Sequence, residues 1–351
     1  MTDLTRRAFG LSAAGLMTAA SFERAMAAQP VDPAKLLDPE LRGPAEMLSK
    51  APMPAASDAT VGVMRQHMLG FMPPKLPAPA ITMRTISGPP GAPDVKVLLT
   101  GLKPGSHMRP AVLHMHGGGF ILGTADASAA DAQRLALDFD CVVVSVDYRL
   151  APETRFPGAL EDNYAALRWL HKNADELGVD RARIAIKGES AGGGHAAMLA
   201  IAARDRGEFA ICCQVLNYPM LDDRTGSVRM PPAHIGTYLW SREGNRYGWS
   251  ALLGFPAGSA TPPPGAVPAR VQNLAGLPPT FIGVGALDLF VDEDMEYAHR
   301  LVDAGVPTEL LVVPGAFHGF DGIAPQARIS REFTAAWHAV LAAAFAERSG
   351  A

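Results

Sequence analysis

A serine between small residues is the strongest chemical signal in the sequence. Gly188-Glu189-Ser190-Ala191-Gly192 fits the pattern G-x-S-x-G, an apolar run (residues 183–186) precedes it, and an alanine-rich helical stretch follows. A sharp strand-to-helix turn holds such a serine in a strained conformation at a helix N-terminus, where developing negative charge is stabilised. An ordinary glycine-rich turn is the alternative, but the flanking strand and helix favour a nucleophilic Ser190.

A seryl hydroxyl becomes nucleophilic only beside a base, normally a histidine that a carboxylate orients. His318 lies in a glycine-containing loop after the apolar run that ends at Val313, and Asp288 follows the apolar run Phe281–Val284. Both positions correspond to the carboxyl ends of predicted strands. We therefore predict a catalytic triad of Ser190, Asp288 and His318, in the chain order Ser, Asp, His.

Other residues compete for these two roles. Asp292 is the main rival of Asp288, but Asp292-Glu293-Asp294 is better suited to capping the following helix. His171, His195 and His299 lie inside helical patterns, where packed or solvated histidines explain them better.

A second glycine-rich segment, His116-Gly117-Gly118-Gly119-Phe120, directly follows a predicted strand. Such glycines leave backbone N–H groups open to a substrate oxygen, and losing one donor to an oxyanion typically costs about 3 kcal/mol. A flexible loop is the alternative. A metal site at His114 and His116 is a weak hypothesis, because no third ligand lies near and no HExxH occurs. We expect no metal or organic cofactor, since phosphate-loop and dinucleotide fingerprints are absent too.

The elements that must position these residues alternate along the chain. Helical patterns cover about 160–171, a stretch after Ser190, a stretch from Met295 to Val302, and about 331–346. Strands alternating with helices predict a mainly parallel sheet with helices on both faces. The runs predicted as strands are Val95–Leu99, Ala111–Met115, Cys141–Val146, Ile184–Ile186, Ile211–Leu216, Thr280–Val284 and Leu310–Val313.

Composition narrows the possible classes of protein. The 351 residues are 48% hydrophobic and carry a net charge of −4, without a run of Lys or Arg. This argues against nucleic-acid binding and supports a large folded core. The three cysteines, Cys141, Cys212 and Cys213, lack CxxC spacing, so we expect buried thiols rather than disulfides or a zinc site.

The N-terminus has the pattern of an export signal. Arg6-Arg7 precedes a mildly apolar stretch, and Ala25-Met26-Ala27 resembles a cleavage site. We predict a twin-arginine signal over residues 1–27 and a periplasmic or secreted mature chain, which has no stable membrane span. An untargeted N-terminal tail on a cytoplasmic protein is the alternative.

Several motifs together resemble the bacterial hormone-sensitive-lipase-like carboxylesterases. They are the HGGGF and GESAG segments, Tyr148–Glu153, Asp288–Glu293 and His318-Gly319-Phe320. The similarity runs from about Pro110 to the C-terminus. It implies an α/β-hydrolase fold, with a mainly parallel sheet of about eight strands, helices on both faces and a helical cap.

The resemblance also implies roles for individual residues. The oxyanion hole would use the N–H groups of Gly118, Gly119 and Ala191, and His116 would brace that loop. Three further residues, Tyr148, Arg149 and Glu153, would maintain the core. Glu189 stands where the family more often has Asp or Thr, and we expect it to orient the loop that carries Asp288 or His318.

Two segments are predicted to form the cap: residues 28–80, a linker followed by short helices, and the insertion 219–265. The core would then comprise 81–218 and 266–351. Both cap segments are rich in methionine or aromatic residues, which suit an adaptable apolar pocket. The candidate substrate-binding residues are Met64, Met68, Met220, Tyr238 and Trp240, with ordinary packing in the cap as the alternative for each.

These features together predict a serine carboxylesterase that acts on small esters with short to medium acyl chains. Three alternatives use the same fold: an amidase or lactonase with the same triad, a lipase acting at lipid interfaces, and a non-catalytic small-ligand-binding protein. The family resemblance also allows a homodimer formed through an edge of the sheet.

Overall fold

The computed structural model describes residues 31–70, 73–103, 105, 107–259 and 261–346. The chain divides between Asp32 and Pro33 into two units, and the fold below is that of the second unit. The predicted export signal, residues 1–27, lies outside the described residues. Within the described ranges, no helix is long and apolar enough to cross a membrane.

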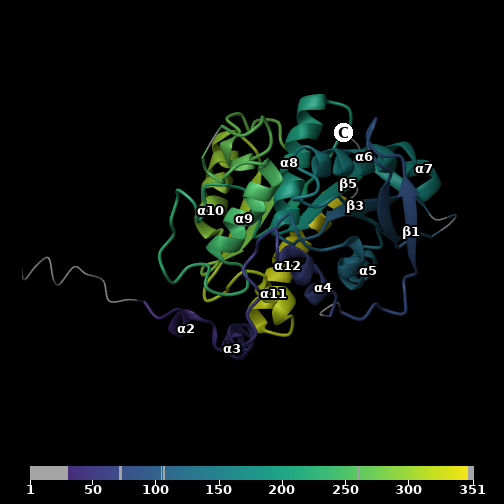
Figure 1. The fold of residues 1–351 in the computed structure, drawn as a ribbon. Helices are drawn as coiled ribbons and strands as arrows, with labels where there is room; N and C mark the ends of the chain where they lie inside the picture. The colour runs from purple at the N-terminus through teal and green to yellow at the C-terminus, as the bar shows by residue number, and fades with distance from the viewer. Residues whose placement is uncertain (1–30, 71–72, 104, 106, 260, 347–351) are drawn as a thin grey trace, which may run out of the picture. The chain divides into compact units, whose positions relative to one another are not determined.

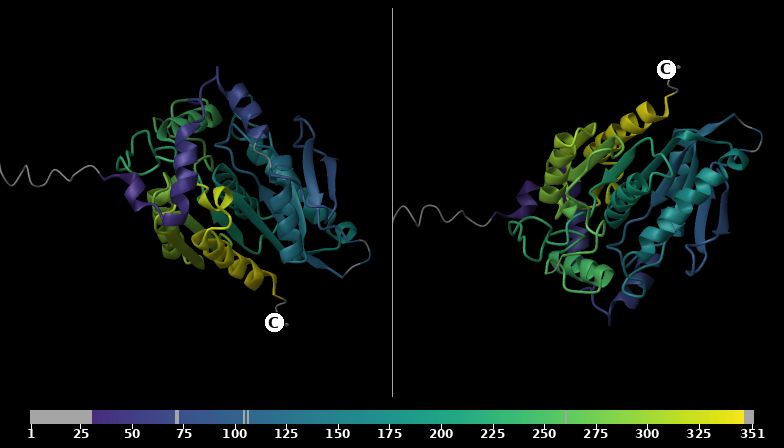
Figure 2. Two further views of the ribbon diagram at one scale, coloured as in Figure 1. Left: turned by 90° about the horizontal axis from the view of Figure 1, so that it is seen from below. Right: turned by 90° about the horizontal axis from the view of Figure 1, so that it is seen from above.

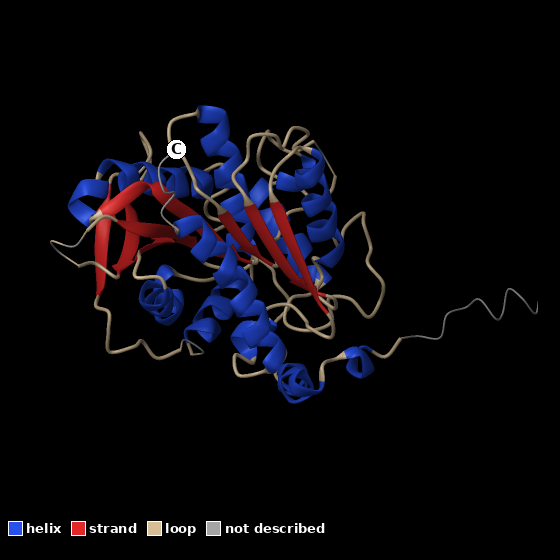
Figure 3. Cartoon of the chain, turned by 180° about the vertical axis from the view of Figure 1, so that it is seen from behind, coloured by secondary structure: helices blue, strands red, loops and turns tan. Residues whose placement is uncertain are grey.

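An eight-stranded sheet forms the centre of this unit (Figures 1 and 3). The strand order across the sheet is β1-β2-β4-β3-β5-β6-β7-β8, and β2 alone runs antiparallel to its two neighbours. The strands are β1 (Ile81–Ile86), β2 (Val95–Thr100), β3 (Arg109–Met115), β4 (Val142–Asp147), β5 (Val179–Glu189), β6 (Gln214–Asn217), β7 (Thr280–Gly285) and β8 (Thr308–Val313).

Alternate residues of the central strands enter two separate hydrophobic cores, one on each face of the sheet. One core is covered by α6 (Gly158–Lys172), α8 (Ala191–Arg206) and part of α10 (Val291–Asp303). The other is covered by α5 (Ala129–Asp138) and α12 (Arg328–Phe345). Figure 2 shows helices on both sides of the strands. Buried faces on both sides explain the continuous apolar runs in the sequence.

The remaining helices lie before β1, between strands or after β8, and several of them also contribute buried residues to the two cores. They are α2 (Pro33–Leu36), η1 (Pro39–Leu41), α3 (Arg42–Lys50), α4 (Val61–Leu69), η2 (Ala125–Ser128), α7 (Ala174–Leu177), α9 (Arg242–Leu253), η3 (Pro268–Arg270) and α11 (Phe320–Ile323). Helix α9 belongs to the long connection between β6 and β7, the segment predicted as an insertion. The predicted short helices before residue 80 correspond to α2, α3 and α4.

The predicted fold class is confirmed, and all seven predicted strands are present, although β5 is much longer than the predicted Ile184–Ile186 and β6 begins three residues later than predicted. Strand β1 was not predicted, because it lies at the edge of the sheet and only Ile86 in it is fully buried. A half-exposed edge strand does not need a continuous apolar run. Helices α5 and α9 were also not predicted.

Candidate active site

Ser190 lies in the turn between β5 and α8, with φ 57° and ψ −123°. A positive φ is unfavourable for any residue with a side chain, so the surrounding contacts must impose it. The N–H of Ser190 donates to the carbonyl of Asn217 at 2.9 Å, and its own carbonyl accepts N–H groups from Gly194 and Met220, each at 3.0 Å. Strand β6, the loop after it and the first turn of α8 therefore hold the strained residue.

Close packing explains the glycines on either side of Ser190. A Cβ atom at Gly188 would lie 2.2 Å from the carbonyl oxygen of Gly192, and one at Gly192 would lie 2.1 Å from the carbonyl oxygen of Met115. Both distances are too short for any side chain. The G-x-S-x-G pattern thus lets α8 approach β5 and β3 closely enough to form the turn.

His318 connects the other two predicted triad residues. Its Nε2 lies 2.9 Å from Ser190 Oγ, and its Nδ1 lies 2.8 Å from Asp288 Oδ2. Ser190 is 8% exposed, His318 5% and Asp288 0%. The residues come from three separate connections, after β5, β7 and β8. The arrangement is that of a nucleophile, a general base and a carboxylate that orients the base.

Asp292, the rival carboxylate, is exposed in the first turn of α10 and is not part of this chain of hydrogen bonds. Residues 292–294 occupy the first turn of α10, as predicted, but none of them makes a side-chain hydrogen bond that caps the helix. Glu293 is instead buried, and its Oε1 accepts the N–H groups of Leu221 and Asp222 at 2.6 and 3.1 Å. It therefore ties α10 to the loop after β6.

Aromatic rings enclose the imidazole of His318. Tyr218 and Phe290 both present an edge-to-face contact, with ring centres 5.0 and 5.1 Å from that of His318. The hydroxyl of Tyr218 donates to Asp321 Oδ1 at 2.8 Å. Burial, with the charge of Asp321 beside it, raises the pKa of Tyr218 well above its ordinary value, so the phenol stays protonated. These contacts fix the plane of the histidine ring.

The HGGGF segment forms a loop beside Ser190. Gly118 and Gly119 have φ of 132° and 59°, and the carbonyl of Gly118 accepts the N–H groups of Ile121 and Leu122 at 3.0 and 2.8 Å. Among the described residues, the N–H groups of Gly118, Gly119 and Ala191 donate no hydrogen bond to the protein. Free donors next to a nucleophile can stabilise an oxyanion.

His116 lies beneath this loop. Its Nδ1 is 2.8 Å from the carbonyl oxygen of Gly117, its ring stacks on Tyr148 at 4.2 Å, and the Tyr148 hydroxyl donates to the carbonyl of His116. Burial lowers the pKa of His116 to about 4, so the ring is neutral near pH 7. A neutral imidazole can donate from Nδ1 to Gly117 and hold the loop in place.

The prediction for Glu189 was wrong. Its side chain does not reach the loops that carry Asp288 and His318. Its Oε2 lies 2.9 Å from His114 Nε2, and its Oε1 accepts a hydrogen bond from Lys187. Spacing along the sequence could not reveal this, because the partner His114 belongs to a different strand.

The predicted pocket residues lie in different surroundings. Met64 and Met220 are buried in the core that covers the α8 face of the sheet, and Met68 packs against it. Tyr238 contacts Phe317 with ring centres 5.5 Å apart. Met220 contacts the nucleophile through its backbone, because its N–H donates to the Ser190 carbonyl at 3.0 Å. Trp240 lies against the oxyanion-forming loop, where a Cβ at Gly119 would lie 2.1 Å from the indole.

Leu239 was not predicted, although it lies between two predicted residues. It has φ 62° and is 43% exposed. A Cβ at Gly319, the residue after His318, would lie 2.9 Å from Leu239 Cδ2. Residues 238–240 therefore contact both the histidine loop and the oxyanion-forming loop. An exposed leucine with positive φ could have been noticed only in the structure.

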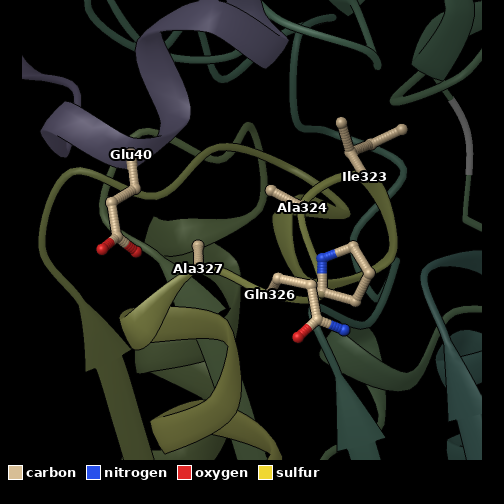
Figure 4. Close-up of a pocket in the computed structure, with 6 residues that line it drawn as sticks. Glu40, Ile323, Ala324, Gln326 and Ala327 are labelled. Atoms are coloured by element: carbon tan, nitrogen blue, oxygen red, sulfur yellow. The ribbon is translucent and has the colours of Figure 1, made fainter.

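Two surface hollows lie away from the triad. One, of about 410 Å³, is lined by Glu40 and residues 323–327 (Figure 4). The other, of about 500 Å³, lies beside the start of β3 and is lined by Arg109, Arg183 and Phe345 among others. Neither includes a triad residue. Within the described part of the chain, no three His, Cys, Asp or Glu side chains are grouped to hold a metal ion.

Comparisons with known proteins agree with this geometry. A protein-family model described as the alpha/beta hydrolase fold matches residues 112–322. The chain is 33% identical to esterase LipI of Mycobacterium tuberculosis over 287 residues, which covers 80% of this chain and 87% of that protein. It is 35% identical to carboxylesterase NlhH of the same organism, over 76% of this chain and 83% of that protein.

Solved structures give the same result. A structure titled bacterial heroin esterase aligns with 90% of this chain and 99% of its own, at 35% identity and a TM-score of 0.79. Esterase LipW from Mycobacterium marinum aligns with 91% of this chain and 98% of its own, at 35% identity and a TM-score of 0.78. The architecture and the resemblance predicted from the motifs are thereby confirmed.

Proposed function

The chain belongs to the alpha/beta hydrolase fold family, and from that premise we propose that it is a serine carboxylesterase acting on esters with short to medium acyl chains. The observation that carries the proposal is the continuous arrangement of Ser190 Oγ, His318 and Asp288 at 2.9 and 2.8 Å. The names of the similar proteins, which are esterases and carboxylesterases, support the substrate class.

In the proposed reaction, Ser190 Oγ attacks the ester carbonyl carbon while His318 Nε2 takes the hydroxyl proton. Asp288 holds Nδ1–H and stabilises the imidazolium. The negative oxygen of the tetrahedral intermediate accepts hydrogen bonds from the N–H groups of Gly118, Gly119 and Ala191. When this intermediate collapses, the bond to the leaving oxygen breaks, and His318 gives its proton to the alcohol.

The acyl group then remains on Ser190 as an ester. His318, neutral again, removes a proton from water as the water oxygen attacks the acyl carbon. A second tetrahedral intermediate forms in the same oxyanion hole. Its collapse releases the carboxylic acid, and the proton on His318 returns to Ser190 Oγ. Every step uses groups of this chain and water.

Hydrolysis of p-nitrophenyl esters from acetate to palmitate by the purified chain tests the proposal, with Ser190→Ala as the matched control. We expect turnover of short and medium esters and a fall in kcat of about 10⁴- to 10⁶-fold in the variant. Covalent labelling by a fluorophosphonate, in which Ser190 Oγ displaces fluoride, tests the nucleophile independently of the substrate.

The outcomes separate the alternatives. Labelling at Ser190 without ester turnover would redirect the search to amides and lactones. If Ser190 is not labelled and the two proteins hydrolyse the esters at the same rate, the catalytic proposal is overturned and a binding protein is favoured. Activity that increases sharply with palmitate at a lipid interface would favour a lipase.

We also propose that residues 1–27 direct export by a twin-arginine route, because Arg6-Arg7, the apolar stretch and Ala25-Met26-Ala27 occur in the required order. The test is cell fractionation of the full chain against Arg6→Lys/Arg7→Lys. We expect the double variant to accumulate in the cytoplasm. Identical distributions of the two proteins would contradict the export signal.

A further inference from the structure

A row of polar side chains crosses the sheet beneath the nucleophile, and the proposed mechanism uses none of them. Ser145 on β4, His114 on β3 and Lys187 on β5 are directly paired in register. Their strand neighbours two residues earlier, Val143, Val112 and Ala185, belong to the core beneath α5 and α12. Alternation along the strands places the polar row on the same face.

Hydrogen bonds connect this row to the residue before the nucleophile. His114 Nδ1 lies 3.1 Å from Ser145 Oγ, and His114 Nε2 lies 2.9 Å from Glu189 Oε2. Lys187 donates to the other oxygen of Glu189. Burial lowers the pKa of His114 to about 3, so its ring is neutral. A neutral ring can donate from Nε2 to Glu189 and accept at Nδ1 from Ser145.

Lys187 is 6% exposed, and its ammonium group lies 4.7 Å from the ring centre of Trp337 on α12. A buried ammonium is unfavourable unless it is paired, because it loses its hydration. Here the carboxylate of Glu189 and the face of the indole take the place of water.

The row connects the strand that carries the nucleophile with the strand that leads into the oxyanion-forming loop. Glu189 directly precedes Ser190, and His114 lies two residues before His116, where the glycine loop begins. The backbones also touch at this point, because a Cβ at Gly117 would lie 3.0 Å from the carbonyl oxygen of Glu189. The bond between Glu189 and His114 therefore fixes the strand of the nucleophile against the strand that leads into the oxyanion-forming loop.

We propose that Lys187, Glu189 and His114 are positioning residues that set the separation between Ser190 Oγ and the N–H groups of the glycine loop. The ammonium of Lys187 holds the Glu189 carboxylate in place, and Glu189 holds His114. The inference rests on the proposed function, since it concerns the geometry of that reaction. Misplacing reacting groups by about 1 Å can cost about 100-fold in rate.

Because the proposed role of Lys187 depends on its charge, the activity should depend on pH. Burial lowers the pKa of Lys187 to about 8, against the opposing charges of Asp321 on α11 and Asp131 on α5. The other titratable groups around it are Glu189, His114 and His338 on α12. Above about pH 8 the ammonium loses its proton, and Glu189 loses its charged donor. Activity should then fall as the pH rises.

The experiment compares wild type, Lys187→Met and Glu189→Gln from pH 6 to 10, with Lys172→Met as the control at an exposed lysine. The readouts are kcat and KM for p-nitrophenyl butyrate, corrected with Ser190→Ala, and the rate of fluorophosphonate labelling. We expect Lys187→Met to lower kcat by about 10- to 100-fold with KM changed by less than about threefold, and to lose the alkaline decline. Glu189→Gln should move that decline to lower pH, because Lys187 loses a neighbouring negative charge.

Active-site titration with the fluorophosphonate separates this role from simple unfolding, since it counts competent molecules. The proposal would be overturned if the variants had the same kcat per titrated site as wild type, or if both kept the pH profile of wild type. If Lys187→Met does not fold, the shift expected in Glu189→Gln still decides. If wild type hydrolyses no ester, the proposed substrate class fails, while the labelling rates of the variants still test the positioning.

Discussion

Asp288 and Asp292 are four residues apart, yet only Asp288 reaches the histidine. Asp288 Oδ1 accepts the N–H of Phe290 at 3.0 Å, which turns Oδ2 toward His318 Nδ1. Asp292 lies in the first turn of α10 and is exposed to solvent. At the scale of one residue, the local turn after β7 decides which carboxylate can orient the base.

Replacing Asp288 by Asn should lower kcat by about 10⁴-fold while the protein still folds, because the amide favours the wrong tautomer of His318. Steady-state kinetics and circular dichroism check this. Asp292→Asn is the matched control, and its kcat should stay within about twofold of wild type, as expected for an exposed site. Equal losses in both variants would show that Asp288 has no special role.

His195 illustrates a buried residue whose effect should appear in stability. It lies on α8 with its ring against Phe120 and Tyr148, at centre distances of 4.9 and 4.5 Å. Burial lowers its pKa from 6.5 to about 3. The folded protein keeps the ring neutral, whereas the unfolded chain takes up a proton below about pH 6.5. His195 therefore makes folding less favourable as the pH falls from 6.5 toward 3.

The prediction is a difference between wild type and His195→Asn in urea denaturation at pH 7 and pH 5. Wild type should lose about 2 kcal/mol more of its free energy of unfolding over this interval than the variant does. Other titrating groups contribute almost equally to the free energy of unfolding of both proteins, so their contributions largely cancel in the comparison. His299→Asn, at an exposed position, should behave like wild type. Parallel losses in wild type and His195→Asn would contradict the assignment.

At the scale of elements, the segment 238–240 matters because it contacts two catalytic loops at once. Leu239 packs on Gly319 and Trp240 packs on Gly119. The segment precedes α9 and is held there in part by Ser241, whose hydroxyl accepts the N–H of Gly244 at 3.1 Å. We expect this segment to limit the size of the ester that can approach Ser190.

Trp240→Ala should therefore raise the preference for bulky esters. The ratio of kcat/KM for p-nitrophenyl octanoate to that for p-nitrophenyl acetate should increase by about 10-fold or more, because the indole no longer fills the space over Gly119. Met230→Ala, a change at a 61% exposed side chain in the same insertion, is the control. An unchanged ratio in Trp240→Ala would place the acyl pocket elsewhere.

At the scale of the whole folded unit, one side chain can connect segments that are far apart in the sequence. Arg65 on α4 donates from Nε to the carbonyl of Ile121 at 2.8 Å and from Nη2 to the carbonyl of Ala151 at 2.9 Å. It also pairs with both oxygens of Glu153 at 2.8 Å. One side chain of the N-terminal helices thus fixes the segments that follow the glycine loop and β4.

We expect Arg65→Met to lower the free energy of unfolding by about 2 to 4 kcal/mol, since two carbonyl oxygens lose a charged donor. Glu153→Gln should cost less than about 1 kcal/mol, because that ion pair is largely exposed. Urea denaturation of both variants measures the difference. Equal small effects would mean that α4 contributes little to holding the loop.

The sequence by itself determined the chemistry and the order of the elements. G-x-S-x-G, the glycine loop and the buried strands could be predicted because each depends on backbone geometry within a few residues. The triad order then followed from where the strands end. These local patterns can be recognised in the sequence because other interpretations of the required glycines and apolar runs are weaker.

Only the tertiary structure decided which side chains meet across the sheet. Glu189 was expected beside the histidine loop, but it bonds to His114 and Lys187. That outcome depends on the register between β3 and β5, and a shift of one residue would turn these side chains to the opposite face. The same holds for Leu239 over Gly319: nothing in the chain between them fixes their distance, and packing of the whole unit does.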